Sequence, residues 1–226
     1  MITEVEKNKI FDLMKNYEKY SLTQIEQTNG DWYTTNLDIR WYSNCVFDFS
    51  DENITDFYLN DQYSKQTRWD FWNQSISLLK KYDIQTTLDI GCANNHFAFL
   101  CNKENIFCLG IEPRKNCVKQ STNVFKENFE NEDYGYIGNI KTFVDFFENN
   151  DKVKFDCISI LNFLHGNEHF SEEIEKLFNL FPKICNYIYI SEPKWENLNI
   201  RKYTDDYIML EKLNNSAVDH ILYKVI

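Results

Sequence analysis

Short apolar runs alternate with helical stretches from residue 86 to the C-terminus. The runs that read as strands are TTLDIG (86–91), FCLGIE (107–112), YGYIG (134–138), FDCISIL (155–161), YIYISE (187–192), YIMLEKL (207–213) and HILYKVI (220–226). Helical periodicity lies between the first five, over 95–103, 114–129, 139–149 and 171–182. This alternation predicts an α/β fold with a parallel sheet covered by helices. Because only NNSAVD separates the last two strands, they are expected to form an antiparallel hairpin that completes a mixed sheet.

The segment before this alternation has a different pattern. Residues 1–28 predict an amphipathic helix, with apolar side chains three or four positions apart at Ile10, Phe11, Leu13, Met14 and Tyr17. Residues 29–62 are rich in aromatics but have no sustained period, which indicates an irregular lid or a short hairpin. Helical periodicity returns over 63–82. We therefore expect an N-terminal helix and cap over residues 1–62, followed by the sheet domain over 63–226.

Composition limits the class of protein. Of 226 residues, 43% are hydrophobic and 16% aromatic, which is typical of a folded chain with a full core. No signal peptide or membrane span is evident at the N-terminus, so we expect a cytoplasmic protein. The net charge of −11 disfavours a nucleic-acid partner. The seven cysteines form no zinc-type spacing, which favours reduced thiols and no metal.

The loop after the first strand, TTLDIGCANNHF, resembles a nucleotide-binding loop with too few glycines. A dinucleotide loop uses glycines so that the backbone can approach a pyrophosphate at a helix N-terminus. Here Gly91 is followed by Ala93 and Asn95 at the next glycine-type positions, and Asp89 would repel a pyrophosphate. An acid suits a cofactor that is cationic and lacks phosphate, such as S-adenosylmethionine. Asn95 is also among the few non-glycine residues that tolerate a left-handed conformation.

A second acid supports the same cofactor. Glu112 ends the next strand, 21 residues after Gly91, where a carboxylate can accept hydrogen bonds from both hydroxyls of an adenosyl ribose. Two alternatives remain open on these residues. One is a nicotinamide-dependent oxidoreductase on a similar sheet, and the other is a catalytically inactive fold that serves as an interaction module.

With LDIGCANNHF, CLGIEP, YIGNI and FDCISILNFLHG, the chain resembles the class I S-adenosylmethionine-dependent methyltransferases, over roughly residues 63–226. The resemblance is to small bacterial members that methylate small molecules or precursors of capsular and other surface polysaccharides. It implies a Rossmann-like sheet in which Asp89, Gly91 and Ala93 surround the methionine part of the cofactor and Glu112 holds the ribose. It also implies an acid near the adenine amino group after the third strand; this sequence has Asn139 there, whose side-chain oxygen can accept the same hydrogen bond.

Candidate catalytic residues follow the fourth and fifth strands. Asn162 and Phe163 follow the fourth strand and are expected to reach the cleft beside the methyl group, with His165 on the following loop. Histidine has a pKa suited to a general base near neutral pH. Glu192, at the end of the fifth strand, is the competing base or an orienting group. His169 is a weaker candidate because it precedes the next helix.

Residues that could bind the methyl acceptor lie in DWYTTNLDIRWYSN and DQYSKQTRW. Aromatic rings form platforms for sugars, and arginine recognises phosphate by paired hydrogen bonds. Arg40, Tyr42, Tyr63 and Arg68 are therefore expected to contact a small anionic acceptor, such as a sugar, a nucleotide sugar or a phosphorylated metabolite. A surface network of ion pairs over aromatic residues is an equally good interpretation of the same pattern. The oligomeric state is left open by the sequence.

Overall fold

The computed structural model describes residues 2–27, 67–93, 95–129, 134–150, 153–161, 171–193, 206–214 and 218–226. Its centre is a seven-stranded sheet with the strand order β3-β2-β1-β4-β5-β7-β6. The strands are β1 (Thr86–Ile90), β2 (Phe107–Glu112), β3 (Gly135–Ile137), β4 (Phe155–Ile160), β5 (Cys185–Pro193), β6 (Tyr207–Asn214) and β7 (Val218–Val225). The first five are parallel, whereas β7 pairs antiparallel with both β5 and β6. The predicted seven-stranded α/β sheet with a closing antiparallel hairpin is therefore confirmed.

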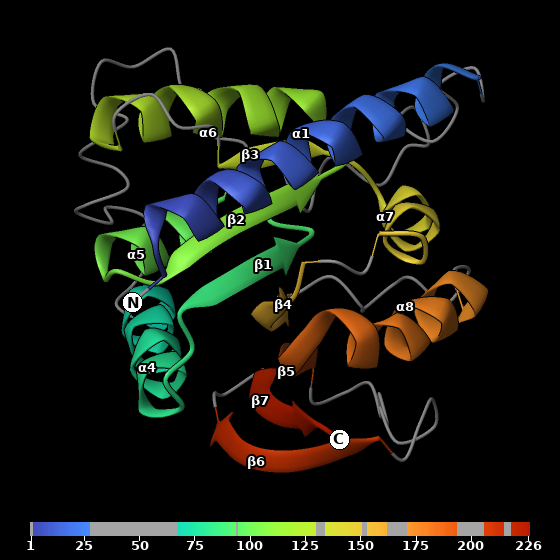
Figure 1. Ribbon diagram of the computed structural model, residues 1–226. Coiled ribbons are helices and arrows are strands. Elements are labelled where there is room, and N and C mark those ends of the chain that lie inside the picture. Colours follow the sequence, from blue (N-terminus) through green and yellow to red (C-terminus); the bar gives the residue numbers. More distant parts are fainter. Residues whose placement is uncertain are drawn as a thin grey trace.

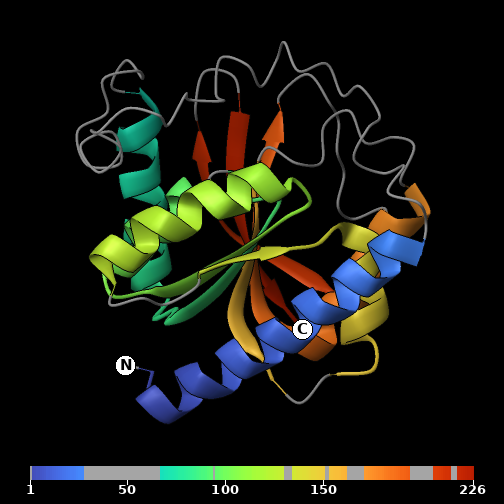
Figure 2. The ribbon, with the colours of Figure 1, turned by 90° about the horizontal axis from the view of Figure 1, so that it is seen from above.

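Helices cover both faces of this sheet (Figures 1 and 2). The helices are α1 (Glu4–Gln27), α4 (Thr67–Lys81), α5 (His96–Lys103), α6 (Lys115–Asn128), α7 (Ile140–Phe147) and α8 (Ser171–Ile184). In both views α4, α5 and α6 lie on one side of the strands, and α7 and α8 lie on the other. The strands β1, β2 and β3 are buried along their whole length, as expected for parallel strands between two helical layers. Within the described parts of the chain, no helix is both long and apolar enough to cross a membrane.

The N-terminal helix α1 packs on the sheet domain. It contacts β3 and α7 and runs along the edge of the sheet (Figure 1). Phe11 contacts the rings of Phe107 and Tyr134 edge-on, at centroid distances of 5.2 and 5.6 Å. The buried stripe of α1 consists of Ile10, Phe11, Met14, Tyr17 and Ser21. The predicted amphipathic helix is thus present, whereas residues 29–62 of the predicted cap lie outside the described residues.

One side chain of α1 also protects the edge of the sheet. Since β3 is an edge strand, the backbone N–H groups that point away from β2 lack a neighbouring strand. Glu18 Oε1 accepts a hydrogen bond of 2.9 Å from the backbone N–H of Ile137. The Glu18 carboxylate therefore accepts the hydrogen bond that a neighbouring strand would otherwise accept, and it fixes α1 against β3.

The end of α8 differs from the prediction, which stopped the helix at Pro182. The helix continues through Pro182 to Ile184, and β5 begins at the next residue. Proline cannot donate a hydrogen bond to the carbonyl four residues earlier, which is that of Phe178. The Tyr207 hydroxyl donates a hydrogen bond of 2.5 Å to this carbonyl instead. A side chain of β6 thus satisfies the group that the proline leaves without a helical donor, and this allows the longer helix.

Candidate functional site

The loop that joins β1 to α5 has the left-handed backbone conformations of a glycine-rich loop, although it contains few glycines. Gly91, Ala93 and Asn95 have φ angles of 77°, 50° and 62°, all in the left-handed region. For alanine this conformation costs about 1–2 kcal/mol, because its Cβ approaches the following carbonyl oxygen. The N–H groups of Gly91 and Cys92 both donate to the carbonyl of Ile111 on β2, at 2.8 and 3.1 Å. These bonds hold the loop over the ends of the two strands.

The side chain of Asn95 explains how the loop tolerates this residue. Asn95 is fully buried, and its Nδ2 donates a hydrogen bond of 3.0 Å to the carbonyl of Tyr134, just before β3. Space for the amide comes from Gly110 on β2, because a methyl group there would collide with Asn95 Oδ1 and lie 2.5 Å from Cys92 Sγ. The loop can therefore have Asn95 at a glycine-type position because Gly110 on β2 leaves space for its side chain.

Asp89 is a buried carboxyl near the end of β1. Its side chain accepts a hydrogen bond of 2.8 Å from the hydroxyl of Ser159, its register partner on β4. Burial raises the pKa of Asp89 from 3.8 to about 7, the charge of Glu112 also acts to raise it, and the Ser159 bond acts to lower it. Asp89 therefore lies near its point of half-ionisation at neutral pH, where a nearby cation would favour the charged form.

Glu112 is the second buried carboxylate, and it lies at the end of β2 with only 3% of its surface exposed. Its Oε2 accepts a hydrogen bond of 3.0 Å from the backbone N–H of Ala93 in the loop. Its Oε1 accepts from the backbone N–H of Arg114 at 3.1 Å and from Arg114 Nε at 2.5 Å. The loop after β1 and the turn after β2 therefore both hold this carboxylate.

Asn139 follows β3, where the resemblance places a contact to adenine. Its Oδ1 accepts a hydrogen bond of 2.9 Å from the backbone N–H of Thr142, and Thr142 Oγ1 accepts one of 3.1 Å from the N–H of Asn139. This is a capping box at the start of α7. The hydroxyls of Tyr17 and Ser21 lie 3.3 and 3.0 Å from Thr142 Oγ1. Asn139 is thus a helix cap tied to α1, and its oxygen keeps a second acceptor site.

The structure brings together some of the predicted site residues. Asp89, Gly91, Ala93 and Glu112 meet at the carboxyl ends of β1 and β2, and Asn139 follows the adjacent strand β3. Glu192 pairs through its backbone with Asp219 on β7, and Arg68 lies in α4, but the side chains of Glu192 and Arg68 are outside the description. Outside the described residues altogether lie Arg40, Tyr42, Tyr63, Asn162, Phe163, His165 and His169.

The sequence interpretation missed Ser159, Arg114 and the bond from α1 to Thr142. Ser159 could have been found as the one hydroxyl in the apolar run FDCISIL, but its pairing with Asp89 depends on the strand register. Arg114 could have been found from its position two residues after Glu112.

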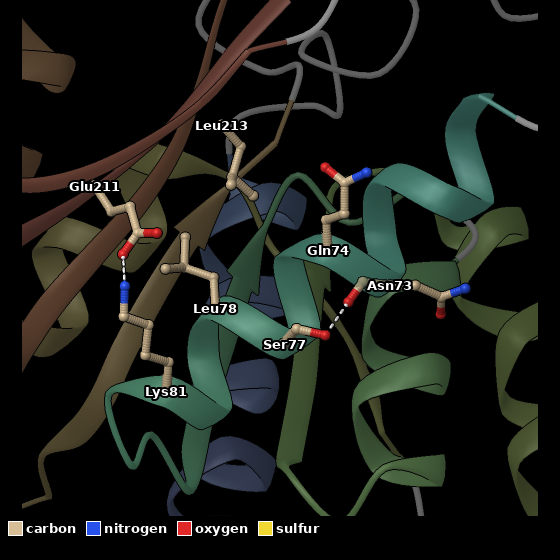
Figure 3. A pocket seen from close by; sticks show the side chains of 7 residues that line it. All are labelled: Asn73, Gln74, Ser77, Leu78, Lys81, Glu211 and Leu213. Carbon is tan, nitrogen blue, oxygen red and sulfur yellow. Dashed lines mark hydrogen bonds and ion pairs between the residues drawn. The ribbon is translucent and has the colours of Figure 1, made fainter.

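An open groove of about 390 Å³ lies elsewhere, between α4 and β6 (Figure 3). Lys81 and Glu211 form an ion pair of 2.5 Å, and the Ser77 hydroxyl donates to the Asn73 carbonyl at 2.8 Å. The groove contains none of the predicted cofactor residues, and several of its polar groups bond to each other. The carboxyl ends of β1 and β2 are therefore the better candidate site.

Comparison with known proteins supports the fold. No protein-family model and no curated protein matches the sequence. Among solved structures, magnesium protoporphyrin IX methyltransferase (ChlM) from Synechocystis PCC 6803 with bound SAM matches with a TM-score of 0.57 and 13% identity, over 85% of this chain and 92% of ChlM. A putative RNA methyltransferase from Pyrococcus horikoshii matches with a TM-score of 0.52 and 11% identity, over 73% of this chain and 89% of that protein.

The bifunctional kinase-methyltransferase WbdD matches with a TM-score of 0.53 and 16% identity, over 75% of this chain and 41% of WbdD. This chain therefore spans about two fifths of the length of WbdD. Together these likenesses show that the chain has the class I methyltransferase fold.

The exchange between Asn95 and Gly110 can be tested by mutation. We expect Gly110→Ala to lower the free energy of unfolding by about 1–3 kcal/mol, because the added methyl group overpacks a filled space. Asn95→Gly in the same chain should restore part of this loss, because it removes the colliding amide. Gly135→Ala is the matched control, since its nearest neighbour, Ser121 Oγ, is 3.0 Å from the added carbon. Urea unfolding gives the free energy of unfolding of the original protein, the two single glycine variants and the double variant. An equal loss in Gly110→Ala and Gly135→Ala would contradict this explanation.

The raised pKa of Asp89 predicts a pH-dependent effect on stability. The folded protein holds this proton more tightly than the unfolded chain, so the resulting stabilisation is present below pH 4 and is lost as the pH rises to about 7. Asp89→Asn keeps an acceptor for Ser159 without the buried charge. We expect this variant to be about 2–4 kcal/mol more stable than the original at pH 8 and equally stable near pH 4. Urea unfolding at pH 8 and pH 4 tests this prediction, with Asp83→Asn at an exposed position as the control. An Asp89→Asn variant that is less stable than the original protein at both pH values would refute it.

Proposed function

We propose that the protein is an S-adenosylmethionine-dependent methyltransferase. The observation that carries the proposal is the pair of buried carboxylates, Asp89 and Glu112, at the ends of adjacent strands with a left-handed loop between them. The fold supports the same conclusion, because it is that of class I methyltransferases.

The residues at this site fit the proposed cofactor. Its sulfonium and ammonium groups would offset the negative charge of the two carboxylates, and its ribose hydroxyls can donate hydrogen bonds to Glu112. The pyrophosphate of a nicotinamide cofactor would instead add negative charge beside Asp89. When bound, S-adenosylmethionine supplies a methyl group activated by its sulfonium.

Around the cofactor, we assign roles to the protein's own residues. Glu112 accepts from the ribose, Asn139 offers its remaining acceptor site to the adenine amino group, and Asp89, Gly91 and Ala93 enclose the methionine part. The residues proposed to lie beside the methyl group are Asn162 and Phe163.

We further propose that the acceptor is a small anionic metabolite, methylated on oxygen. A sugar or phosphoryl-type precursor of bacterial capsular polysaccharide fits this description. Arg40, Tyr42, Tyr63 and Arg68 would bind it, with the arginines pairing with its charge. The structural likeness to WbdD, a kinase-methyltransferase, is compatible with a phosphorylated acceptor.

RNA is the competing acceptor, since a putative RNA methyltransferase shares the fold. The net charge of −11 opposes binding to a polyanion, which favours the small metabolite. A cytoplasmic location is part of the proposal, and it agrees with the free state of the six cysteines that the structure describes.

Cofactor binding is the first test of the proposal. We expect calorimetric titration to show binding of S-adenosylhomocysteine and none of NAD, because the carboxylates at the site oppose a pyrophosphate. Glu112→Ala should weaken this binding by about tenfold or more, since it removes a charged hydrogen-bond acceptor worth about 1.5–3 kcal/mol. The exposed Glu104→Ala is a control for loss of charge. Binding of NAD alone would favour an oxidoreductase, and binding of neither ligand would favour an inactive interaction module.

The proposed chemical step assigns the proton of the acceptor hydroxyl to His165, with Glu192 orienting the acceptor or the imidazole. General-base catalysis contributes about 100- to 10,000-fold, so His165→Ala should lower kcat by about that factor and leave cofactor affinity unchanged. Release of S-adenosylhomocysteine over a panel of nucleotide sugars and phosphorylated metabolites gives the rates, and His169→Ala tests the weaker candidate for the same role. Unchanged turnover in the His165→Ala variant would remove His165 from the mechanism, and turnover on tRNA alone would overturn the acceptor class.

A further inference from the structure

Arg114 makes the closest contact to the carboxylate that we propose for the ribose. Its Nε lies 2.5 Å from Glu112 Oε1, and 37% of the Arg114 side chain is exposed, against 4% of the Glu112 side chain. Arg114 is also the residue before α6, but its side chain makes no capping hydrogen bond to that helix. The contact with Glu112 therefore does not follow from a role in helix capping.

The number of hydrogen bonds at Glu112 limits what else it can accept. A carboxylate has about four acceptor positions. The protein itself fills three of them, with the N–H of Ala93, the N–H of Arg114 and the Nε of Arg114. Two ribose hydroxyls need two positions, so one of the three protein donors has to leave when both hydroxyls bind.

Only one of these donors can leave without movement of the backbone. The N–H of Ala93 belongs to a loop whose neighbours Gly91 and Cys92 are bonded to Ile111, and the N–H of Arg114 belongs to the turn between β2 and α6. The Nε of Arg114 is at the end of a partly exposed, rotatable side chain. Rotation of this side chain breaks the ion pair without moving the backbone.

Electrostatics make such an exchange favourable for a ligand that carries a cationic group. Asp89 and Glu112 place two carboxyls in one buried region, and the charge of Glu112 acts on Asp89. The guanidinium of Arg114 offsets part of this charge. A ligand that carries an ammonium group, as both S-adenosylmethionine and S-adenosylhomocysteine do, can take over that role, whereas a ligand without a cationic group cannot.

We propose that Arg114 competes with the ribose for Glu112, so that its displacement sets the affinity for the adenosyl cofactor. The inference rests on the proposed function, because it assumes that Glu112 is the ribose acceptor. Arg114 is then a residue that tunes cofactor affinity and not a cofactor ligand. Its removal should tighten binding, which loss of a merely structural contact would not do.

The test compares the affinity of S-adenosylhomocysteine for the original protein, Arg114→Ala and Lys115→Ala by calorimetry. A partly exposed ion pair is worth up to about 1 kcal/mol, so we expect Arg114→Ala to bind about two- to sixfold more tightly at about 50 mM salt. The gain should shrink toward onefold at about 500 mM salt, where the ion pair of the original protein is screened. Lys115→Ala removes the same charge from the exposed next residue and should bind like the original protein.

The other outcomes separate this inference from the proposed function. Weaker or unchanged binding by the Arg114→Ala variant, or an equal gain in the Lys115→Ala variant, would overturn the inference. Arg114→Lys should give an intermediate affinity, because the ammonium keeps the charge but lacks the Nε donor. If none of the four proteins binds S-adenosylhomocysteine, the proposed function fails, and the inference that rests on it fails too.

Discussion

Two carboxyl groups removed from water at the ends of neighbouring strands are the constraint around which this site is built. Burying a charged carboxylate is costly unless hydrogen bonds or an opposite charge compensate it. Asp89 has one hydroxyl donor, from Ser159, and burial leaves it with a pKa of about 7. Glu112 has two backbone donors and the guanidinium of Arg114. Asp89, which has fewer hydrogen-bond donors, therefore responds to what binds nearby.

This arrangement links the site to several distant parts of the chain. Ser159 comes from β4, and the carbonyl that anchors Asn95 precedes β3. The helix α1 contacts Thr142 in the first turn of α7 through the hydroxyls of Tyr17 and Ser21. Gly138, in the turn after β3, leaves room for the Tyr17 side chain. The N-terminal helix is therefore part of the same packed unit as the loop between β1 and α5. A displacement of α1 would therefore change the position of Asn139, which is bonded to Thr142.

The sequence predicted the parts of this structure that depend on local pattern. Seven apolar runs identified the strands, and the short NNSAVD connection identified the hairpin. Asp89 and Glu112 were placed on the first two strands because Asp89 lies within, and Glu112 at the end of, a strand-like run. Their partners were not predictable in this way, since Ser159 and Asp89 are 70 positions apart and meet only through the register of β1 with β4. Likewise, the sequence alone does not show that the Asn95 amide fills the space next to Gly110, because the two residues are brought together only by the fold.

We propose that Glu112 receives the ribose of an adenosyl cofactor that is held at the carboxyl ends of β1 and β2. The most direct measurement is a crystal structure of the protein with S-adenosylhomocysteine. We expect both ribose hydroxyls within hydrogen-bond distance of the Glu112 carboxylate, with the Arg114 guanidinium turned away from it. A ligand bound at another place, or a ribose at this site that makes no contact with Glu112, would contradict it.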